Sequence, residues 1–376
     1  MSLGFPLFFK ALYVTFFRRP FSLRRLFWTT LFGALYWIVW CIVAIGRALD
    51  HVFFPGFRAI EIKKPIFIVG TPRSGTSFTQ RLMCLDEEQF VFYRLYQTIF
   101  PAIVYQRLFD ALAWADSRCG GVFSRAIRWG ERKCFGGWDS KHFMALTNPE
   151  EDEGLLVHTL MTESIFMLFP YFEDLWVAGF PDMLAPRERA KFMCYYRSCL
   201  QRHLYSQGGQ RTLLCKSTSF PGRVESMLEA FPDARVIHLI RHPYETLPSH
   251  VSLFHQVWRV HSPEIAKDSP ESRLYAQLAV DWYKQMLAQR EHLEAHQYIR
   301  VRYAELKSDA MGTIERIYQH FSLPMSDAYR GRLTEATRGL GDYRSGHDYS
   351  LEEFGLSKEW VQQELGEVMD AYCFER

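Results

Sequence analysis

Several common signatures are missing from this chain of 376 residues. It has no Cys-x-x-Cys pair, no internal repeat and no long low-complexity segment, and its formal net charge is only +2. The eight cysteines are scattered without histidine-rich neighbours, which offers no zinc site and is typical of reduced thiols, although Cys119 and Cys134 could pair in an oxidising compartment. The near-neutral charge argues against nucleic acid as the partner. With 48% hydrophobic residues, the chain can bury a full core.

One lysine is missing from a phosphate-binding pattern. Residues 65–69 form a short apolar run that predicts a buried strand, and helical spacing resumes at Phe78. Gly70 and Gly75 bound the turn between them, but Thr76 stands where a nucleoside triphosphatase carries lysine. Such a turn binds an anion through backbone N–H groups and a helix N-terminus. A kinase or nucleotide hydrolase with a degenerate loop is therefore the less favoured alternative.

The cation of this turn lies inside it, because Arg73 follows Pro72. An arginine crowded together with hydroxyl groups in one turn is costly unless an anion is bound there. The residues predicted to contact the anion are Thr71, Pro72, Arg73, Ser74, Gly75, Thr76 and Ser77.

A second motif follows another predicted strand. Residues 235–240 are apolar enough to be buried, and Arg241 comes at their carboxyl end, where open α/β sheets bind ligands. Ser249 lies eight residues further, on the next predicted helix.

With both motifs in this order, the sequence resembles the sulfotransferase superfamily that uses 3′-phosphoadenosine-5′-phosphosulfate (PAPS), in particular its bacterial-type members. The resemblance runs from about residue 65 to the C-terminus and includes residues 148–153, 214–217, 301–306 and 347–352. It implies that the first loop holds the 5′-phosphosulfate, that Arg241 and Ser249 hold the 3′-phosphate, and that Tyr303 approaches the adenine. Sulfuryl transfer needs fixed cations rather than a metal, and Lys216 is the second candidate beside Arg73.

The alternation of predicted strands and helices indicates an α/β fold, P-loop-like and three-layered, with a central parallel sheet and added N-terminal hydrophobic helices. We expect a hydrophobic segment over 1–60 and a catalytic domain over 61–376. The expected strands are 65–69, 212–216, 235–240 and 298–303, and the main expected helices are 187–207, 224–231, 275–293 and 314–321.

The acceptor's proton needs a general base. Many relatives place a glutamate just after the first helix, but this chain offers Gln97, whose amide cannot accept that proton. The run from Asn148 to Glu153 is typical of a solvated helix start, yet one of its carboxylates could face the cleft. The candidates are Glu150, Glu151, Asp152, Glu153, His142 and His158, of which Glu151 is preferred and His158 comes next. Arg344 and His347 are expected to close over the donor.

The first sixty residues indicate membrane association. Residues 26–46 contain no charged residue, and a run of this length suffices to cross a bilayer. Residues 5–17 suit a helix in the interface. A true span and a monotopic insertion both fit, as does packing on the domain or on a second subunit, and basic residues on both sides leave the orientation open.

An aromatic patch over 165–172 and the membrane segment together suggest an apolar acceptor such as a lipid. PAPS is made in the cytosol, and the scattered cysteines fit a cytosolic catalytic domain, whereas a lumenal domain would need a donor transporter. A homo-oligomer fits the sequence equally well. The other class of protein that must be distinguished from a sulfotransferase is a membrane protein that senses the nucleotide without catalysis.

Overall fold

The computed structural model describes residues 4–135, 145–338 and 349–375. At its centre is a five-stranded sheet of order β2-β3-β1-β4-β5, in which every neighbouring pair of strands is parallel. The strands are β1 Ile66–Val69, β2 Phe90–Val91, β3 Thr212–Ser217, β4 Arg235–Ile240 and β5 Tyr298–Arg302. The predicted parallel α/β fold is confirmed, and β4 has the expected bounds.

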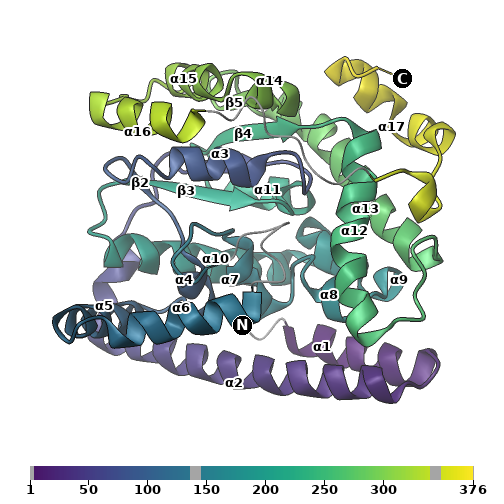
Figure 1. Ribbon diagram of the computed structural model, residues 1–376, viewed down its shortest axis with the longest axis horizontal. Helices are drawn as coiled ribbons and strands as arrows, with labels where there is room; N and C mark the ends of the chain where they lie inside the picture. The colour runs from purple at the N-terminus through teal and green to yellow at the C-terminus, as the bar shows by residue number, and fades with distance from the viewer. Residues whose placement is uncertain (1–3, 136–144, 339–348, 376) are drawn as a thin grey trace.

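Side chains alternate across the strands and bury both faces of the sheet. In β1, Ile66 and Ile68 face one apolar cluster, while Phe67 and Val69 face the other. Helices α3, α15 and α16 cover the first face, and α10, α12 and α13 contribute to the larger core on the second. The molecule thus has the three layers expected of this sheet (Figure 1).

The helices lie close to the expected positions, with ends that differ by a few residues. Those of the first half are α1 Gly4–Tyr13, α2 Leu23–Phe53, α3 Thr76–Met83, α4 Leu95–Ile99, α5 Ile103–Arg118, α6 Val122–Phe135, α7 Glu153–Leu156, α8 Ile165–Leu168 and α9 Phe172–Leu175. Those of the second half are α10 Pro186–Ser206, α11 Val224–Ala230, α12 Pro243–His261, α13 Pro270–Gln289, α14 Tyr303–Ser308, α15 Ala310–His320, α16 Asp327–Thr337 and α17 Lys358–Tyr372.

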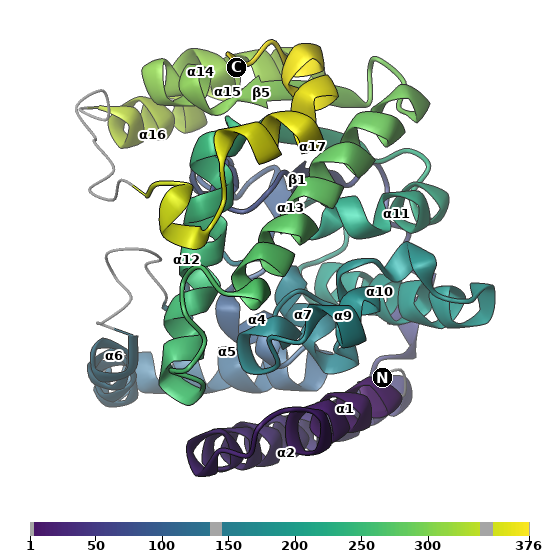
Figure 2. The same ribbon diagram turned by 90° about the vertical axis from the view of Figure 1, so that its right-hand side faces the viewer.

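The hydrophobic N-terminal segment forms two helices along the base of the molecule. In Figures 1 and 2, α1 lies beside α2 at the base of the molecule, and the α5–α6 pair also lies at this base. Leu7, Phe8, Ala11 and Val14 belong to the main core cluster, so this segment packs directly on the domain. The other side of α2 is exposed.

Burial corrects one expectation about side chains. The aromatic patch over 165–172 is mostly core: Phe166, Phe169 and Phe172 are at most 2% exposed, and Phe172 packs on Trp258. It therefore gives no support for an acceptor pocket. Cys119 is a free thiol, in agreement with the reduced cysteines that the sequence indicates, and the side chain of Cys134 lies outside the described residues.

Candidate active site

The turn between β1 and α3 has the strained backbone of an anion loop. Gly70, Arg73 and Gly75 have φ values of 151°, 72° and 97°. A Cβ on Gly70 would lie 2.4 Å from the Leu239 carbonyl oxygen, and one on Gly75 would lie 2.9 Å from the Tyr303 ring. Only glycine fits at these two positions, which brings the loop backbone close to the ends of β4 and β5.

The loop is prepared for a ligand. Ser74 is fully buried, and its hydroxyl has no hydrogen-bond partner. The first N–H groups of α3 have no partner within the helix and carry the positive end of its dipole. A buried hydroxyl without a partner is costly, and an anion in the loop would satisfy it.

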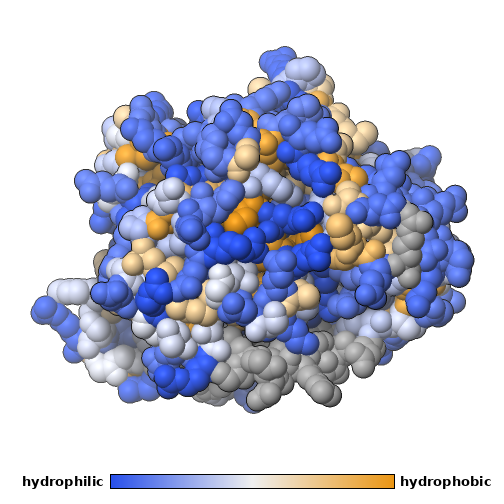
Figure 3. Space-filling view, turned by 90° about the horizontal axis from the view of Figure 1, so that it is seen from above, coloured by the Kyte–Doolittle hydropathy of each residue, from blue (hydrophilic) through white to orange (hydrophobic). Residues whose placement is uncertain are grey.

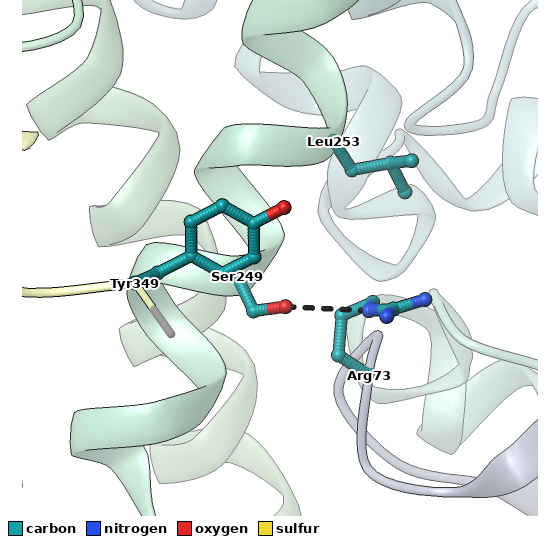
Figure 4. A pocket seen from close by; sticks show the side chains of 4 residues that line it. All are labelled: Arg73, Ser249, Leu253 and Tyr349. Atoms are coloured by element: carbon teal, nitrogen blue, oxygen red, sulfur yellow. Dashed lines mark hydrogen bonds between the residues drawn. The ribbon is translucent and has the colours of Figure 1, made fainter. Parts of the chain in front are cut away.

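The two predicted motifs meet. The Arg73 guanidinium donates through Nε to the Ser249 hydroxyl at 3.3 Å, as Figure 4 shows. The Arg241 guanidinium donates to the Arg73 carbonyl oxygen at 2.9 Å. A small pocket here is lined by Arg73, Ser249, Leu253 and Tyr349. The loop after β1 and the segment after β4 therefore share one site.

Tyr283 links the loop after β1 to the segment after β4 through two hydrogen bonds. Thr71 donates to the Tyr283 hydroxyl at 3.1 Å, which in turn donates to the Arg241 carbonyl oxygen at 2.7 Å. Arg241 also pairs with Glu245 at 2.7 Å, and its guanidinium stacks 4.5 Å from the centre of the Tyr303 ring. Arg241 is thus held flat against an aromatic surface at the edge of the sheet.

Lys216 lies on β3, the strand next to β1, and points to the same edge. Its ammonium group is 2.6 Å from the Ser77 hydroxyl and 2.6 Å from a Glu151 carboxylate oxygen. Lys216 is 1% exposed and Glu151 is 24% exposed. The cation is therefore enclosed, while the carboxylate beside it reaches solvent.

A second carboxylate, which the sequence analysis missed, lies behind this pair. The Thr218 hydroxyl is 3.2 Å from Glu151 Oε2 and 3.0 Å from Glu163 Oε1. Glu163 also contacts His250 Nε2 at 3.3 Å and accepts from the Tyr275 hydroxyl at 3.1 Å. One hydroxyl proton cannot serve both carboxylates at once, so Thr218 donates to only one of them at a time. Only the place of Thr218, just beyond the strand end, could have indicated it from sequence.

The acidic run is not a solvated helix start. Helix α7 begins at Glu153, not near Pro149, and both Asp152 and Glu153 are buried. Burial raises the pKa of Asp152 to about 7, and its carboxylate accepts from Tyr196. Glu153 pairs with the buried Arg223 at 2.8 Å. These two carboxylates belong to the core. Glu150 and Glu151 are partly exposed, and Glu151 is the one that pairs with Lys216 at the edge.

The other proposed bases are placed elsewhere. His158 is buried in a 3₁₀ turn, its ring Nε2 lies 3.4 Å from the Thr98 carbonyl oxygen, and burial lowers its pKa to about 4. Its own carbonyl oxygen accepts from Tyr36 of α2. The expectation that one helix brings it near the acidic run is wrong. Gln97 caps α4 through the Arg94 N–H.

His142, Arg344 and His347 lie outside the described residues. Among the described residues, no group of three or more His, Cys, Asp or Glu side chains could hold a metal ion. His238 is a satisfied core histidine, as expected, because its Nδ1 lies 2.8 Å from the Tyr298 hydroxyl and burial lowers its pKa to about 3.

A glycine-bounded anion loop at the edge of a parallel sheet, with arginine and lysine on separate elements in place of the loop lysine, defines a P-loop-like group-transfer enzyme. The comparisons name the group. A family model described as the sulfotransferase family matches residues 65–327, and the chain belongs to that family.

The relatives agree with this assignment. The chain is 24% identical over 319 residues to the omega-hydroxy-beta-dihydromenaquinone-9 sulfotransferase Stf3 of Mycobacterium bovis, an alignment that covers 83% of this chain and 76% of the relative. Among solved structures, sulfotransferase STF9 from Mycobacterium avium has a TM-score of 0.73 at 20% identity, covering 87% and 81% of the two chains. STF1 from Mycobacterium tuberculosis has a TM-score of 0.64 at 22% identity, covering 88% and 83%. These structures share the fold.

Proposed function

We propose that this sulfotransferase moves the sulfuryl group from PAPS to a hydroxyl or amine of an apolar acceptor, without a metal. The observation that carries the proposal is the meeting of Arg73, Ser249 and Arg241 at one edge of the sheet. Two separate anion-binding motifs at one site suit a nucleotide with anionic groups at both its 5′ and 3′ ends.

The residues present fit this donor. The unpartnered Ser74 hydroxyl, the loop N–H groups with Thr76 and Ser77, and Arg73 would hold the 5′ end. Arg241, as a guanidinium fork, and Ser249 would hold the 3′-phosphate. Tyr303, which already stacks on Arg241, would face the adenine. The donor would supply the group to be transferred and an anionic leaving group.

Lys216 and Glu151 would divide the remaining work. Negative charge develops on the leaving group, and the enclosed Lys216 ammonium beside Ser77 is a preorganised cation for it. Glu151 reaches solvent and would take the acceptor's proton. Protonated Glu151 would then give its proton to the Thr218 oxygen while the Thr218 hydroxyl gives its own proton to Glu163, which regenerates the Glu151 carboxylate. Glu163 would hold the proton until the product has left, when the same chain returns it to solvent through Glu151.

The acceptor class rests on two observations. A relative of similar length is named for a hydroxylated dihydromenaquinone, and α2 is long and apolar enough to associate with a membrane. We therefore propose a membrane lipid hydroxyl as the acceptor, with the catalytic domain on the cytosolic side. The free thiols among the described residues fit that reducing compartment.

Titration calorimetry separates this function from a kinase or hydrolase. We expect 3′,5′-bisphosphoadenosine to bind at least tenfold more tightly than ATP, and Ser249→Ala to weaken that binding about tenfold, the loss of roughly one charge-assisted hydrogen bond. Ser252→Ala, one turn further along α12, is the matched control and should bind as the wild type does. Equal binding of ATP and the bisphosphate would contradict the proposal.

Turnover separates the enzyme from a nucleotide sensor. The full chain, incubated with radiolabelled PAPS and a total lipid extract, is expected to label one or a few apolar species. If the bisphosphate binds but no acceptor is labelled in lipid or water-soluble extracts, the protein is a sensor.

A further inference from the structure

We propose that α2 lies in the plane of a membrane, sunk into one leaflet by its outer face, and does not cross the bilayer. This inference rests on the proposed membrane association and adds its geometry. By length and composition, residues Leu23–Phe53 pass as a membrane span. How the helix is attached to the rest of the chain argues against that orientation.

The outer face of α2 is apolar along nearly its whole length. Exposed large side chains recur every three or four residues, which places them on one side of a helix. They are Phe27, Leu31, Leu35, Ile38, Ile42, Ile45, Leu49 and Val52. Ile38, at the middle of the helix, is 57% exposed, and Val52, near its end, is 71% exposed. Monomeric soluble proteins rarely expose a contiguous apolar face of this length, and such a face marks a site of interaction with a membrane or another protein.

The N-terminal end of α2 is fastened to the catalytic domain. Arg25 is buried, donates to the Ser262 hydroxyl at 2.9 Å and forms an ion pair with Glu264. Arg24 donates to the Val260 carbonyl oxygen at 2.6 Å. Because Val260 and Ser262 lie at the end of α12, this end of α2 cannot leave the domain without exposing a buried guanidinium.

The other end is fastened by a buried carboxylate. Asp50 is fully buried, pairs with Arg202 at 2.8 Å and accepts from the N–H groups of Ile103 and Val104 at 3.0 Å each. Between the two ends, Gly46 packs so closely on α5 that a Cβ there would lie 2.2 Å from the Tyr105 ring.

The two fastened ends decide the orientation. From Arg25 to Asp50, the helix rises about 37 Å, more than the ~30 Å hydrocarbon core of a bilayer. If α2 crossed that core while attached, the polar domain packed along it would lie in the hydrocarbon. Releasing the Asp50 end would break its ion pair with Arg202 and its hydrogen bonds with the N–H groups of Ile103 and Val104.

Neighbouring helices extend the apolar surface beyond one stripe. Exposed apolar side chains on α1, α5 and α6, all at the base of the molecule in Figures 1 and 2, include Phe9, Tyr13, Leu112, Trp114, Ile127 and Trp129. Exposed tryptophan and tyrosine suit the headgroup level. The opposite side, seen in Figure 3, is mostly hydrophilic. The exposed apolar side chains thus lie on four helices. A second copy of the chain would need only the apolar stripe on α2, so the width of this surface favours a lipid surface as its occupant.

A labelling experiment tests the orientation. Single cysteines are introduced at Arg18 and Ala59, which flank α2 and are exposed. Before that, Cys134 and the cysteines that are exposed among the described residues are replaced by serine: Cys41, Cys119, Cys194 and Cys373. The full chain is expressed in cells, and sealed membrane vesicles of each sidedness are treated with an impermeant maleimide. We expect both positions to react from the same side. Reaction of the two positions from opposite sides would overturn the proposal.

A flotation experiment tests the occupant of the face. The double variant Ile38→Glu/Ile42→Glu should reduce binding to phosphatidylcholine–phosphatidylglycerol vesicles at least tenfold, whereas Met183→Glu, an exposed apolar residue before α10, should not. Unchanged thermal unfolding shows that the variant is folded. Unchanged vesicle binding, or a dimer that the double variant separates without loss of vesicle binding, would overturn the proposal. Because neither readout needs sulfuryl transfer, failure of the proposed catalysis is distinguishable from failure here.

Discussion

Glu151 and Glu153 lie two residues apart in one acidic run, and each pairs with a cation, but the two pairs have different surroundings. Glu151 and Lys216 meet at 2.6 Å with the carboxylate 24% exposed, whereas Glu153 and Arg223 meet at 2.8 Å with the carboxylate 5% exposed. The first pair faces the edge of the sheet beside Ser77. The second is sealed in the core. Position relative to the strand ends, not charge, separates a group available for chemistry from one that holds the fold.

The surroundings of each pair explain the difference. Arg223 also donates to the hydroxyls of Ser217 and Ser219, so the partners of its two terminal nitrogens all lie inside the protein. Lys216 has its contacts on the loop side, and Glu151 retains access to solvent. Solvent therefore reaches the Glu151 carboxylate, whereas the Glu153 carboxylate is almost fully enclosed.

The largest effect is expected for Glu151→Gln. Loss of a general base lowers turnover by about 10²- to 10⁴-fold, and the proposed role predicts a fall in kcat with little change in the KM for the donor. Steady-state kinetics with the labelled lipid acceptor measures this. Because Glu151 is partly exposed and the enclosed Lys216 keeps its contact with the Ser77 hydroxyl, the free energy of unfolding should fall by less than the ~3–5 kcal/mol of a fully buried pair. A variant with wild-type kcat would remove Glu151 from the mechanism.

The matched substitution Glu153→Gln should reverse this pattern. It leaves the buried Arg223 guanidinium without its charge partner, which costs about 3–5 kcal/mol of stability. Urea denaturation should show the loss, while kcat per folded molecule stays within about threefold of the wild type. If Glu153→Gln removes activity and leaves stability unchanged, the two pairs have been assigned the wrong way round.

The sequence predicted which strand ends form this site better than it predicted which carboxylates face it and which are buried. Both anion motifs and Lys216 follow strands whose short apolar runs are readable, and parallel strands must end at one edge, so their meeting was predictable. Which carboxylate of 150–153 faces that edge was not, because it depends on α7 beginning at Glu153 rather than at Pro149. Glu163 was missed because it lies 55 residues from its Thr218 partner, and no local pattern reports such a contact.

A smaller effect is expected when Glu163, which Thr218 links to Glu151, is changed. Glu163→Gln keeps the shape and one acceptor oxygen, so either Thr218 or Tyr275 can still donate to it but not both, and the amide cannot take up a proton. We expect about a tenfold lower kcat and an altered acid limb in the pH profile of kcat, since regeneration of the Glu151 carboxylate becomes limiting. Tyr275→Phe removes one bond to Glu163 without changing its charge and is the control. A lower stability with an unchanged pH profile would leave Glu163 a purely structural role.

The smallest effect concerns a sealed titratable group. Burial lowers the pKa of His158 to about 4, below its usual value near 6.5, so the folded state binds fewer protons than the unfolded state between these values. Its contribution to stability is therefore fully present above pH 6.5 and is lost as the pH falls towards 4. From pH 7 to pH 5.5 the loss is about 1 kcal/mol. Urea denaturation at both values should show a loss that is about 1 kcal/mol larger in the wild type than in His158→Gln, which keeps its other buried histidines, while the variant keeps its turnover at pH 7. Loss of turnover with a flat stability difference would return His158 to the site, because a histidine that charges freely in the folded state is not sealed beneath α2.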